Sequence, residues 1–540
     1  MPAVVNDNSR RRQGCNPLPA PECRATPVAS ASPSELLPPK AVWSAVVLLL
    51  IMLGPLFVCM PLNSDTALFD VQASVMLNGG VLYRDIVEPN LPGIVWLHSA
   101  IRSVAGWSFE AMNAADLLIV AGILCLCCAL LRQSKFRRQP IAASLFVLLA
   151  MLFYLSTNEW CHAQRDTWML LPALAAVWLR STSAPGSRAI RQAVLEGICW
   201  GAAFWIKPHV AIPAIAVIAA DLFRRSSLPS ALKEIVAVIA GGILVALPGV
   251  VWLVSTGTWH HFQDMMLNWN PEYLAAGASR KDLNRWLMMV ERFRPWWIVH
   301  LVAIPLAIGS LRAGSGTSNS AGKRSQRLMS AAYIGWLAQS FGLQHAMDYI
   351  HVPALLLGMV VIAGWNWQLD VSLRRTAVCA FLLLAMLSSP MLRPQRLANW
   401  TRCWTEGSTP QIRASLAHGN FPDWEHLSDV VRFLKSQHVQ DGQLTCANVH
   451  SVHLYNELRI RPATRYWTMT ILRELFPSRV DLIDNTLRCS DQRFLVVEER
   501  EQSLASDEVP PSYDTTLPVV FRSGTYTVLD THPQRIAHAR

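Results

Sequence analysis

The chain has 540 residues, of which 52% are hydrophobic and only 16% are charged. Soluble domains carry about 25% charged residues, so this composition excludes an ordinary soluble protein and predicts an integral membrane protein. The formal net charge of +10 does not indicate nucleic-acid binding, because many of the basic residues lie in short runs between apolar segments, as in cytoplasmic loops.

The N-terminal residues 1–40 are rich in Pro, Ser, Ala and Arg and contain no apolar segment, which predicts a disordered cytoplasmic tail. Eleven apolar runs follow, and each is a predicted transmembrane helix. They lie near 41–60, 113–131, 140–156, 166–179, 193–206, 208–223, 234–256, 296–311, 328–343, 352–368 and 376–392. With the N-terminus inside, every inside loop of an eleven-span arrangement is basic. We therefore expect a polytopic α-helical domain over 41–392.

The apolar stretch over 193–223 is too long for one span but makes two short ones. We predict a hairpin that turns at Lys207 and Pro208, because proline fits the first turn of a helix, where its missing N–H has no partner. Gly197 and Gly201 form a GxxxG pattern that allows close packing of helices.

The first outside loop, over 61–113, is unusually long. Polar residues recur at helical spacing between Thr66 and Asn78, which predicts an amphipathic helix at the membrane interface that ends at Gly79. Asp65 begins this helix. It suits an N-cap and suits a catalytic carboxylate equally well, and the two roles are compatible.

A second long outside loop, over 258–295, contains Trp269, Tyr273 and Trp286, which suit either burial at the interface or stacking on a sugar. After residue 392 charged residues become frequent, which predicts a small α/β domain over 393–540 outside the cytoplasm. Within it we expect an amphipathic helix over 424–438 and strands over 443–449, 493–497 and 526–529.

Several motifs in this order resemble the GT-C superfamily of membrane glycosyltransferases, and most closely its protein O-mannosyltransferase and lipid A aminoarabinose transferase type. The matching residues are Asp65, Gly80, Leu82, Tyr83, Arg84, Asp85, Glu88, Pro89, Asn90, Pro92, Gly93, Gln164, Arg165, Asp166, Lys207, Pro208, Gln344, His345, Tyr349, Ile350, His351 and Pro353. The likeness covers about 41–392. The chain departs from it at Thr66, where many relatives have a second acidic residue.

The resemblance implies transfer of a hexosyl or pentosyl group from a polyprenyl-phosphate sugar to a lipid, glycan or protein acceptor. Asp65 would be the general base. Arg165, Lys207, His345 and His351 would bind the lipid phosphate at the outer ends of spans. Arg165 also suits an interfacial anchor, and the histidines suit ordinary loop positions. Tyr83, Arg84, Asp85 and Glu88 would bind the acceptor or form a salt-bridged turn.

The sequence contains no recognised metal or nucleotide motif, since His260 and His261 lack a third ligand at zinc spacing. No cofactor is predicted with certainty, although a divalent metal fits the resemblance. Cys59, Cys125, Cys127, Cys128, Cys199 and Cys379 lie in apolar runs, whereas Cys161, Cys403, Cys446 and Cys489 are expected outside, where one disulfide is plausible.

The alternative to an enzyme is a transporter or flippase for lipid-linked or anionic substrates. Transporters tend to show internal repeats and charges near the membrane midplane, whereas here no repeat is visible and the candidate charges gather toward one side. A polymerase or ligase that moves whole glycans from a diphosphate lipid is a third reading. We expect the protein in a bacterial inner membrane.

Overall fold

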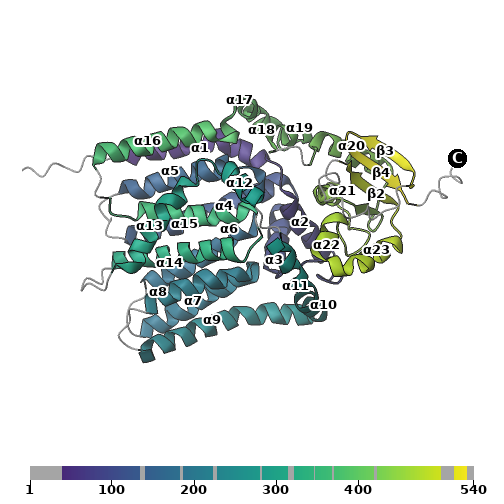
Figure 1. Ribbon diagram of the computed structural model, residues 1–540. Coiled ribbons are helices and arrows are strands. Elements are labelled where there is room, and N and C mark those ends of the chain that lie inside the picture. The colour runs from purple at the N-terminus through teal and green to yellow at the C-terminus, as the bar shows by residue number, and fades with distance from the viewer. Residues whose placement is uncertain are drawn as a thin grey trace, which may run out of the picture.

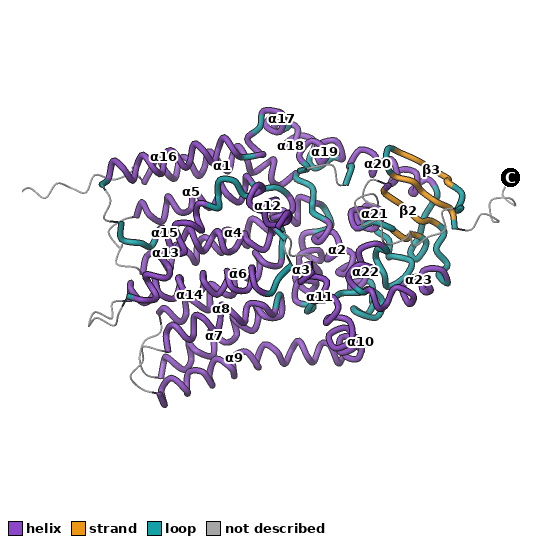
Figure 2. Tube along the Cα trace, in the orientation of Figure 1, coloured by secondary structure: helices purple, strands orange, loops and turns teal. Residues whose placement is uncertain are grey.

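The computed structural model describes residues 39–133, 140–182, 187–222, 228–279, 283–313, 321–345, 347–367, 370–418, 422–499 and 516–531. Almost all of the predicted N-terminal tail therefore lies outside the described residues. Figure 1 shows a bundle of long helices lying side by side, with a smaller C-terminal part against one end of the bundle. In Figure 2 the strands are confined to that C-terminal part.

Every predicted span has a helix at its position, because an apolar segment in lipid must satisfy its own backbone hydrogen bonds. These helices are α1 (Pro39–Cys59), α4 (Phe109–Gln133), α5 (Pro140–Ser156), α6 (Arg165–Thr182), α7 (Ser187–Ile206), α8 (Ala211–Leu222), α9 (Leu228–Ser255), α13 (Ile298–Arg312), α14 (Ala321–Gly342), α15 (Val352–Ala363) and α16 (Val371–Ser388).

Three of the described helices, α1, α4 and α9, are long and apolar enough to cross a membrane by length and composition. Shorter apolar helices accompany them, among them α5, α13 and the segments that contain α8 and α15. Large apolar side chains are exposed along α9, including Val236, Ile243 and Val251, which suits contact with lipid. The chain is an integral membrane protein, while the number of its spans and its orientation stay predictions.

The predicted turn between α7 and α8 is confirmed. Lys207 is extended, with φ −157°, and Pro208 opens a short 3₁₀ turn, η2 (Pro208–Val210). The predicted close packing at the glycines of α7 is also confirmed, and α9 is the partner. A Cβ on Gly197 would lie 1.9 Å from the carbonyl oxygen of Val238, and one on Gly241 would lie 2.0 Å from that of Val194.

The first outside loop folds into α2 (Ser64–Leu77) and α3 (Gly93–Ala105). The prediction of an amphipathic helix is wrong for α2, whose polar side is buried, while its position at the membrane interface stays a prediction. Its polar residues Thr66, Asp70 and Gln72 are as buried as its apolar ones, because α3 and the C-terminal part cover it. Gly79, with φ +81°, ends the turn after α2 as expected.

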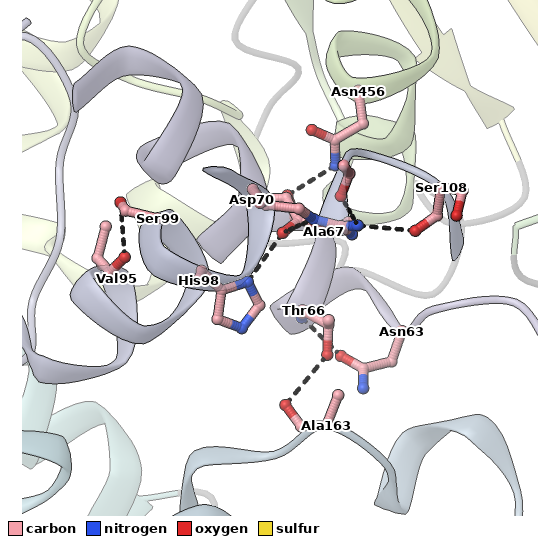
Figure 3. A network of polar contacts seen from close by, with 12 residues as sticks. Asn63, Thr66, Ala67, Asp70, Val95, His98, Ser99, Ser108, Ala163 and Asn456 are labelled. Carbon is pink, nitrogen blue, oxygen red and sulfur yellow. Dashed lines mark hydrogen bonds and ion pairs between the residues drawn. The ribbon is translucent and has the colours of Figure 1, made fainter. Parts of the chain in front are cut away.

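Asp70 ties α2 to α3 through a buried ionic network (Figure 3). One of its carboxylate oxygens accepts hydrogen bonds from His98 Nδ1 and from Arg102 Nε, both at 2.8 Å, and the other accepts from Arg102 Nη2. These bonds hold the pKa of Asp70 below its usual value against the opposing effect of its burial. The hydrogen bonds of this network take the place of those that water would make to the Asp70 carboxylate, which would otherwise be buried as an unpaired charge.

The second outside loop is helical. It comprises α10 (Trp259–Asp264), a π-helical turn η3 (Met265–Trp269), α11 (Asn270–Ser279) and α12 (Leu283–Arg292). Trp269 is buried against Tyr466 and Phe476, with the guanidinium groups of Arg465 and Arg479 over its ring. This tryptophan therefore anchors the C-terminal part. Four short turns also join the helices: η1 (Glu159–Cys161), η4 (Asp348–His351), η5 (Pro390–Leu392) and α17 (Pro394–Leu397).

The C-terminal part continues with α18 (Trp400–Glu406) and α19 (Pro410–Leu416) and builds a four-stranded sheet in the order β1-β2-β4-β3. Its strands are β1 (Leu444–Cys446), β2 (Phe494–Glu498), β3 (Val519–Ser523) and β4 (Tyr526–Asp530); β1 and β2 are parallel and the other pairs antiparallel. The remaining helices are α20 (Trp424–Ser436), η6 (Val449–Val452), α21 (His453–Leu458), α22 (Thr470–Leu475), η7 (Pro477–Arg479) and α23 (Val480–Arg488).

The three predicted strands and the amphipathic helix α20 are confirmed. The apolar side of α20, which includes Leu427, Val430 and Leu434, is buried as its spacing predicts. Strand β3 was not predicted. It is one of the two edge strands of the sheet and is partly exposed, and it lacks the apolar alternation that marks a half-buried strand.

We predict that Gly197→Ala lowers the melting temperature of the detergent-solubilised protein, because a methyl group has no room against the α9 backbone and overpacking costs about 1–3 kcal/mol. The matched control is Gly54→Ala in α1, where a Cβ would meet nothing within 4 Å. Circular dichroism on heating should show a lower melting temperature than the wild type for Gly197→Ala and an unchanged one for Gly54→Ala. Equal melting temperatures for both would contradict close packing at α7 and α9.

Candidate active site

Most of the predicted site residues meet at the end of the bundle that faces the C-terminal part. Four pieces of chain converge there: the first turn of α2, the first turn of α6, the break between α7 and α8, and η4. Asp65, Arg165, Lys207 and Tyr349 come from these four pieces in that order. The electrostatic neighbours of Asp65 are Arg165, Tyr349, Lys207 and Asp166.

Asp65 is not the N-cap of α2. Asn63 is the cap, since its side-chain oxygen accepts the backbone N–H of Thr66 at 2.9 Å. The Asn63 amide nitrogen donates in turn to the carbonyl oxygens of Glu159 and His162, at 3.1 and 3.0 Å. The carboxylate of Asp65 is therefore not used as a cap. It lies in the first turn of a helix whose N-terminus is hydrogen-bonded to the loop before α6.

Burial raises the pKa of Asp65 above its usual value, and this effect outweighs the opposing ones of the Arg165 charge, a hydrogen bond with Tyr349 and the Lys207 charge. The residue as a whole is nevertheless partly exposed. A carboxylate with a raised pKa beside cations suits a group that accepts a proton during a reaction.

Lys207 forms a buried ion pair with Asp166. Its Nζ donates to both carboxylate oxygens, at 2.9 and 2.7 Å, and also to Oε1 of Gln344 at the end of α14. The lysine is 4% exposed and the aspartate 0%. A charge so deep in an apolar bundle is costly unless it is paired, and such residues usually serve function.

Arg165 lies at the centre of the site. It is near enough to Tyr273, Tyr349, Asp166 and Glu88 for electrostatic interaction, and it is the foremost cation acting on Asp65 and on Glu88. Its Nη1 is buried and makes no hydrogen bond to the described residues. A buried guanidinium with a free donor is well suited to an anionic ligand such as a phosphate oxygen.

The motif from Tyr83 to Glu88 divides into two roles. Arg84 and Asp85 pair with each other at the surface, at 2.7 Å, and Asp85 accepts the backbone N–H of Val81 at 2.7 Å. Tyr83 is buried at a left-handed φ of +68° and donates to the carbonyl oxygen of Asn90 at 2.7 Å. The alternative of a salt-bridged turn therefore describes this stretch well.

Glu88 points inward instead. Its Oε1 accepts the backbone and side-chain N–H groups of Asn90, at 2.7 and 2.6 Å, while its buried Oε2 has no partner among the described residues. Burial raises the pKa of Glu88 above its usual value, and the Arg165 charge opposes the rise. Glu88 thus joins the site through Arg165.

The two predicted histidines lie in different surroundings. The ring of His345 is 4.8 Å from that of Tyr273, which is itself near Arg165. His351 is buried among Phe341, Trp297 and Trp286, with ring centroids 4.8, 5.5 and 6.1 Å away. The role of both as phosphate ligands stays a prediction, and the aromatic surroundings of His351 favour it less.

The C-terminal part contacts the start of α2 beside Asp65, a contact that the sequence does not predict. His450 Nδ1 is 2.7 Å from the hydroxyl of Ser64, the residue before Asp65. The ring of Trp160 packs edge-to-face on His450, with centroids 5.3 Å apart. The side-chain amide of Asn456 also donates to the carbonyl oxygen of Ala67 at 2.8 Å (Figure 3). Nothing in the local sequence around residue 450 signals this contact.

A metal site is not apparent among the described residues, which contain no group of three or more His, Cys, Asp or Glu side chains placed to hold an ion. Asp65, Asp166 and Glu88 interact electrostatically with Arg165, whose charge would repel a metal cation bound beside them.

The fold is similar to that of solved structures of a membrane protein that the sequence resemblance includes. In particular, the crystal structure of ArnT from Cupriavidus metallidurans bound to undecaprenyl phosphate aligns with a TM-score of 0.54 and 12% identity, covering 92% of this chain and 98% of that one. The apo state of the same protein aligns with a TM-score of 0.54 and 14% identity, over 91% and 97%. No family model and no curated protein matches the chain. The resemblance stated from the sequence is thus confirmed at the level of fold.

We predict that Lys207→Met alone destabilises the protein by about 3–5 kcal/mol, because it leaves Asp166 as an unpaired buried charge. The double variant Asp166→Asn with Lys207→Met should recover most of this loss, since it removes both charges. Thermal unfolding of the three proteins in one detergent measures the difference. A single variant as stable as the wild type would show that the pair is not needed for folding.

Proposed function

We propose that the protein is a glycosyltransferase that moves a sugar from a polyprenyl-phosphate carrier to an acceptor outside the cytoplasm. The observation that carries the proposal is the buried Arg165, whose Nη1 has no partner among the described residues, beside Asp65 and the Asp166–Lys207 pair at one end of the helical bundle. The solved structure of similar fold, ArnT, holds undecaprenyl phosphate, a lipid of the class that such a cationic end would bind.

The chemistry assigned to each group follows from its charge and its position. Asp65 takes the proton of the acceptor nucleophile as that atom attacks the anomeric carbon. The bond between the anomeric carbon and the phosphate oxygen breaks, and its electron pair leaves with the lipid phosphate. Arg165, and then Lys207, stabilise the negative charge on that phosphate.

The same proposal includes the membrane arrangement. The tail over 1–40 lies in the cytoplasm, eleven spans over 41–392 form the catalytic domain, and the domain over 393–540 lies outside, where it covers the site. The membrane is the bacterial inner membrane. A transporter for lipid-linked substrates is the second candidate, but no observation on the structure favours it over the enzyme.

We predict that Asp65→Asn lowers the transfer rate about 10²- to 10⁴-fold, because the amide cannot accept the proton of the nucleophile. The measurement is loss of label from radiolabelled polyprenyl-phosphate sugars, with purified protein in nanodiscs and a crude membrane fraction as acceptor. Asp441→Asn, which removes an exposed carboxylate paired with Arg461, is the control and should retain the rate.

The pH dependence of the same reaction gives a second readout of Asp65. Since the pKa of this carboxylate is raised, kcat/KM should rise as the pH passes a value above about 3.9, the usual pKa of aspartate, and then level off as Asp65 becomes ionised. Equal turnover by wild type and Asp65→Asn would remove Asp65 as the base. Turnover of no lipid-linked sugar by folded wild type would favour the transporter.

We predict that His450→Ala lowers kcat about 10- to 100-fold while KM for the lipid donor changes little, since the loss of the contact with Ser64 loosens the helix end that holds Asp65. His450→Asn should restore much of the rate, because its amide can occupy the place of Nδ1. His438→Asn, at an exposed histidine, is the control. Equal rates for the Ala and Asn variants would argue against a positioning role for His450.

A further inference from the structure

Two cysteines that the sequence places 344 residues apart meet at the outer end of α1. Cys59 is the last residue of α1, and Cys403 lies in the middle of α18. The Sγ of Cys59 donates a hydrogen bond to the carbonyl oxygen of Cys403 at 3.4 Å, and the two thiols are near enough to interact electrostatically. Both side chains are buried.

The segment that carries Cys403 is fixed along α1 on both sides of the cysteine. Before it, Trp400 Nε1 donates to the carbonyl oxygen of Ile51 at 2.8 Å. After it, the hydroxyl of Ser408 donates to the carbonyl oxygen of Cys59 at 2.9 Å. The approach of the two sulfur atoms is therefore set by the packing of two helices, and it does not depend on a single side-chain rotamer.

Cys59 lies in the apolar span to which the sequence assigns it, as the last residue of α1, at the end of the helix where the C-terminal part packs (Figure 1). Cys446, which was expected outside with Cys403, is buried in the sheet and donates to the carbonyl oxygen of Ser451 at 3.2 Å. The described structure therefore brings Cys403 to Cys59 as its neighbour.

We propose that Cys59 and Cys403 form a disulfide when the protein matures in an oxidising compartment, and that this bond fastens the start of the C-terminal domain to the first transmembrane helix. The proposal uses the orientation given above, with the C-terminal domain outside, but not the glycosyltransferase activity. It concerns residues that contact none of the groups assigned to the reaction.

The reaction balances as a thiol–disulfide exchange with an oxidised thiol–disulfide oxidoreductase, which supplies the disulfide. The Cys403 thiolate attacks one sulfur of that disulfide and releases the other as a thiolate. Cys59 then loses its proton and attacks the Cys403 sulfur of the mixed disulfide. The oxidoreductase leaves with two thiols, having gained two electrons and two protons.

The surroundings of Cys403 suit the attacking role. The hydrogen bond from Cys59 holds the pKa of the Cys403 thiol below its usual value, and the charge of Arg402 acts in the same direction. A thiol with a lowered pKa is present more often as the thiolate, which is the reactive form.

The test counts thiols on the full-length protein. Membranes from a host with a working thiol-oxidation system are denatured in excess maleimide, with or without prior reduction, and the purified protein is weighed by mass spectrometry. The wild type should gain two labels on reduction, and a non-reduced digest should contain a peptide pair that joins residue 59 to residue 403.

Matched variants make the outcome specific. Cys59→Ser and Cys403→Ser should each gain no label on reduction, whereas Cys446→Ser should still gain two. In a host without the thiol oxidase the wild type should carry both thiols free. Full labelling of the wild type without reduction in the oxidising host would overturn the proposal, and so would a linked peptide that joins Cys403 to another cysteine. Labelling is done in denaturant, so a variant that folds poorly still gives an answer.

Discussion

The buried ion pair of Asp166 and Lys207 is the interaction on which the rest of the site depends. A lysine ammonium inside an apolar bundle is tolerated only when an anion and further acceptors replace its water. Asp166 at the start of α6 and Gln344 after α14 supply them, so the pair fixes three helices at the point where the α7–α8 turn interrupts the hydrophobic run. Arg165, next in sequence to Asp166, is placed by the same constraint. The network of Asp70, His98 and Arg102 repeats this solution in α2 and α3.

The physics of lipid made the bundle predictable, because long apolar runs must become helices wherever water is absent. Lys207 with Pro208 marked the turn, and Gly197 with Gly201 marked the close packing, since both are local signals. The wrong prediction for α2, that its polar side is exposed, arises because the burial of this helix depends on residues far away in the sequence. Helical spacing reports that one side of a segment is apolar, but it cannot report a second cover that arrives from residues 450 and 456, nearly 400 positions later. Of the two roles that the sequence left open for Asp65, the N-cap is wrong, because Asn63, two residues earlier, is an equally good capping residue and takes that position.

The site was predictable in part because some of its residues, like the turn and the close packing, are marked by local signals. Charged residues at the ends of apolar runs are conspicuous, so Asp65, Arg165 and Lys207 could be named from the sequence as candidates. Their mutual arrangement could not, since Lys207 is 41 positions from Asp166 and 137 from Gln344, and no periodicity spans such distances. Glu88 and Asp85 illustrate the limit well: three residues apart in one motif, one turns inward toward Arg165 and the other remains at the surface.

The shortness of α8 has a consequence for the bilayer around the protein. With the turn η2, the described helical segment runs over Pro208–Leu222 and rises about 22 Å along its axis, whereas the hydrocarbon layer is about 30 Å thick. Ile215 on this helix is 66% exposed, so one side of α8 is open to lipid, whereas Pro213, Ala214 and Val217 are buried where α14 packs against the helix. Thinning of the bilayer is one way to accommodate a short span, and beside α8 it would bring the headgroups closer to the end of the helix that carries Lys207. On the proposed function, a polyprenyl-phosphate carrier that approached along this side would then hold its phosphate closer to the depth of Lys207.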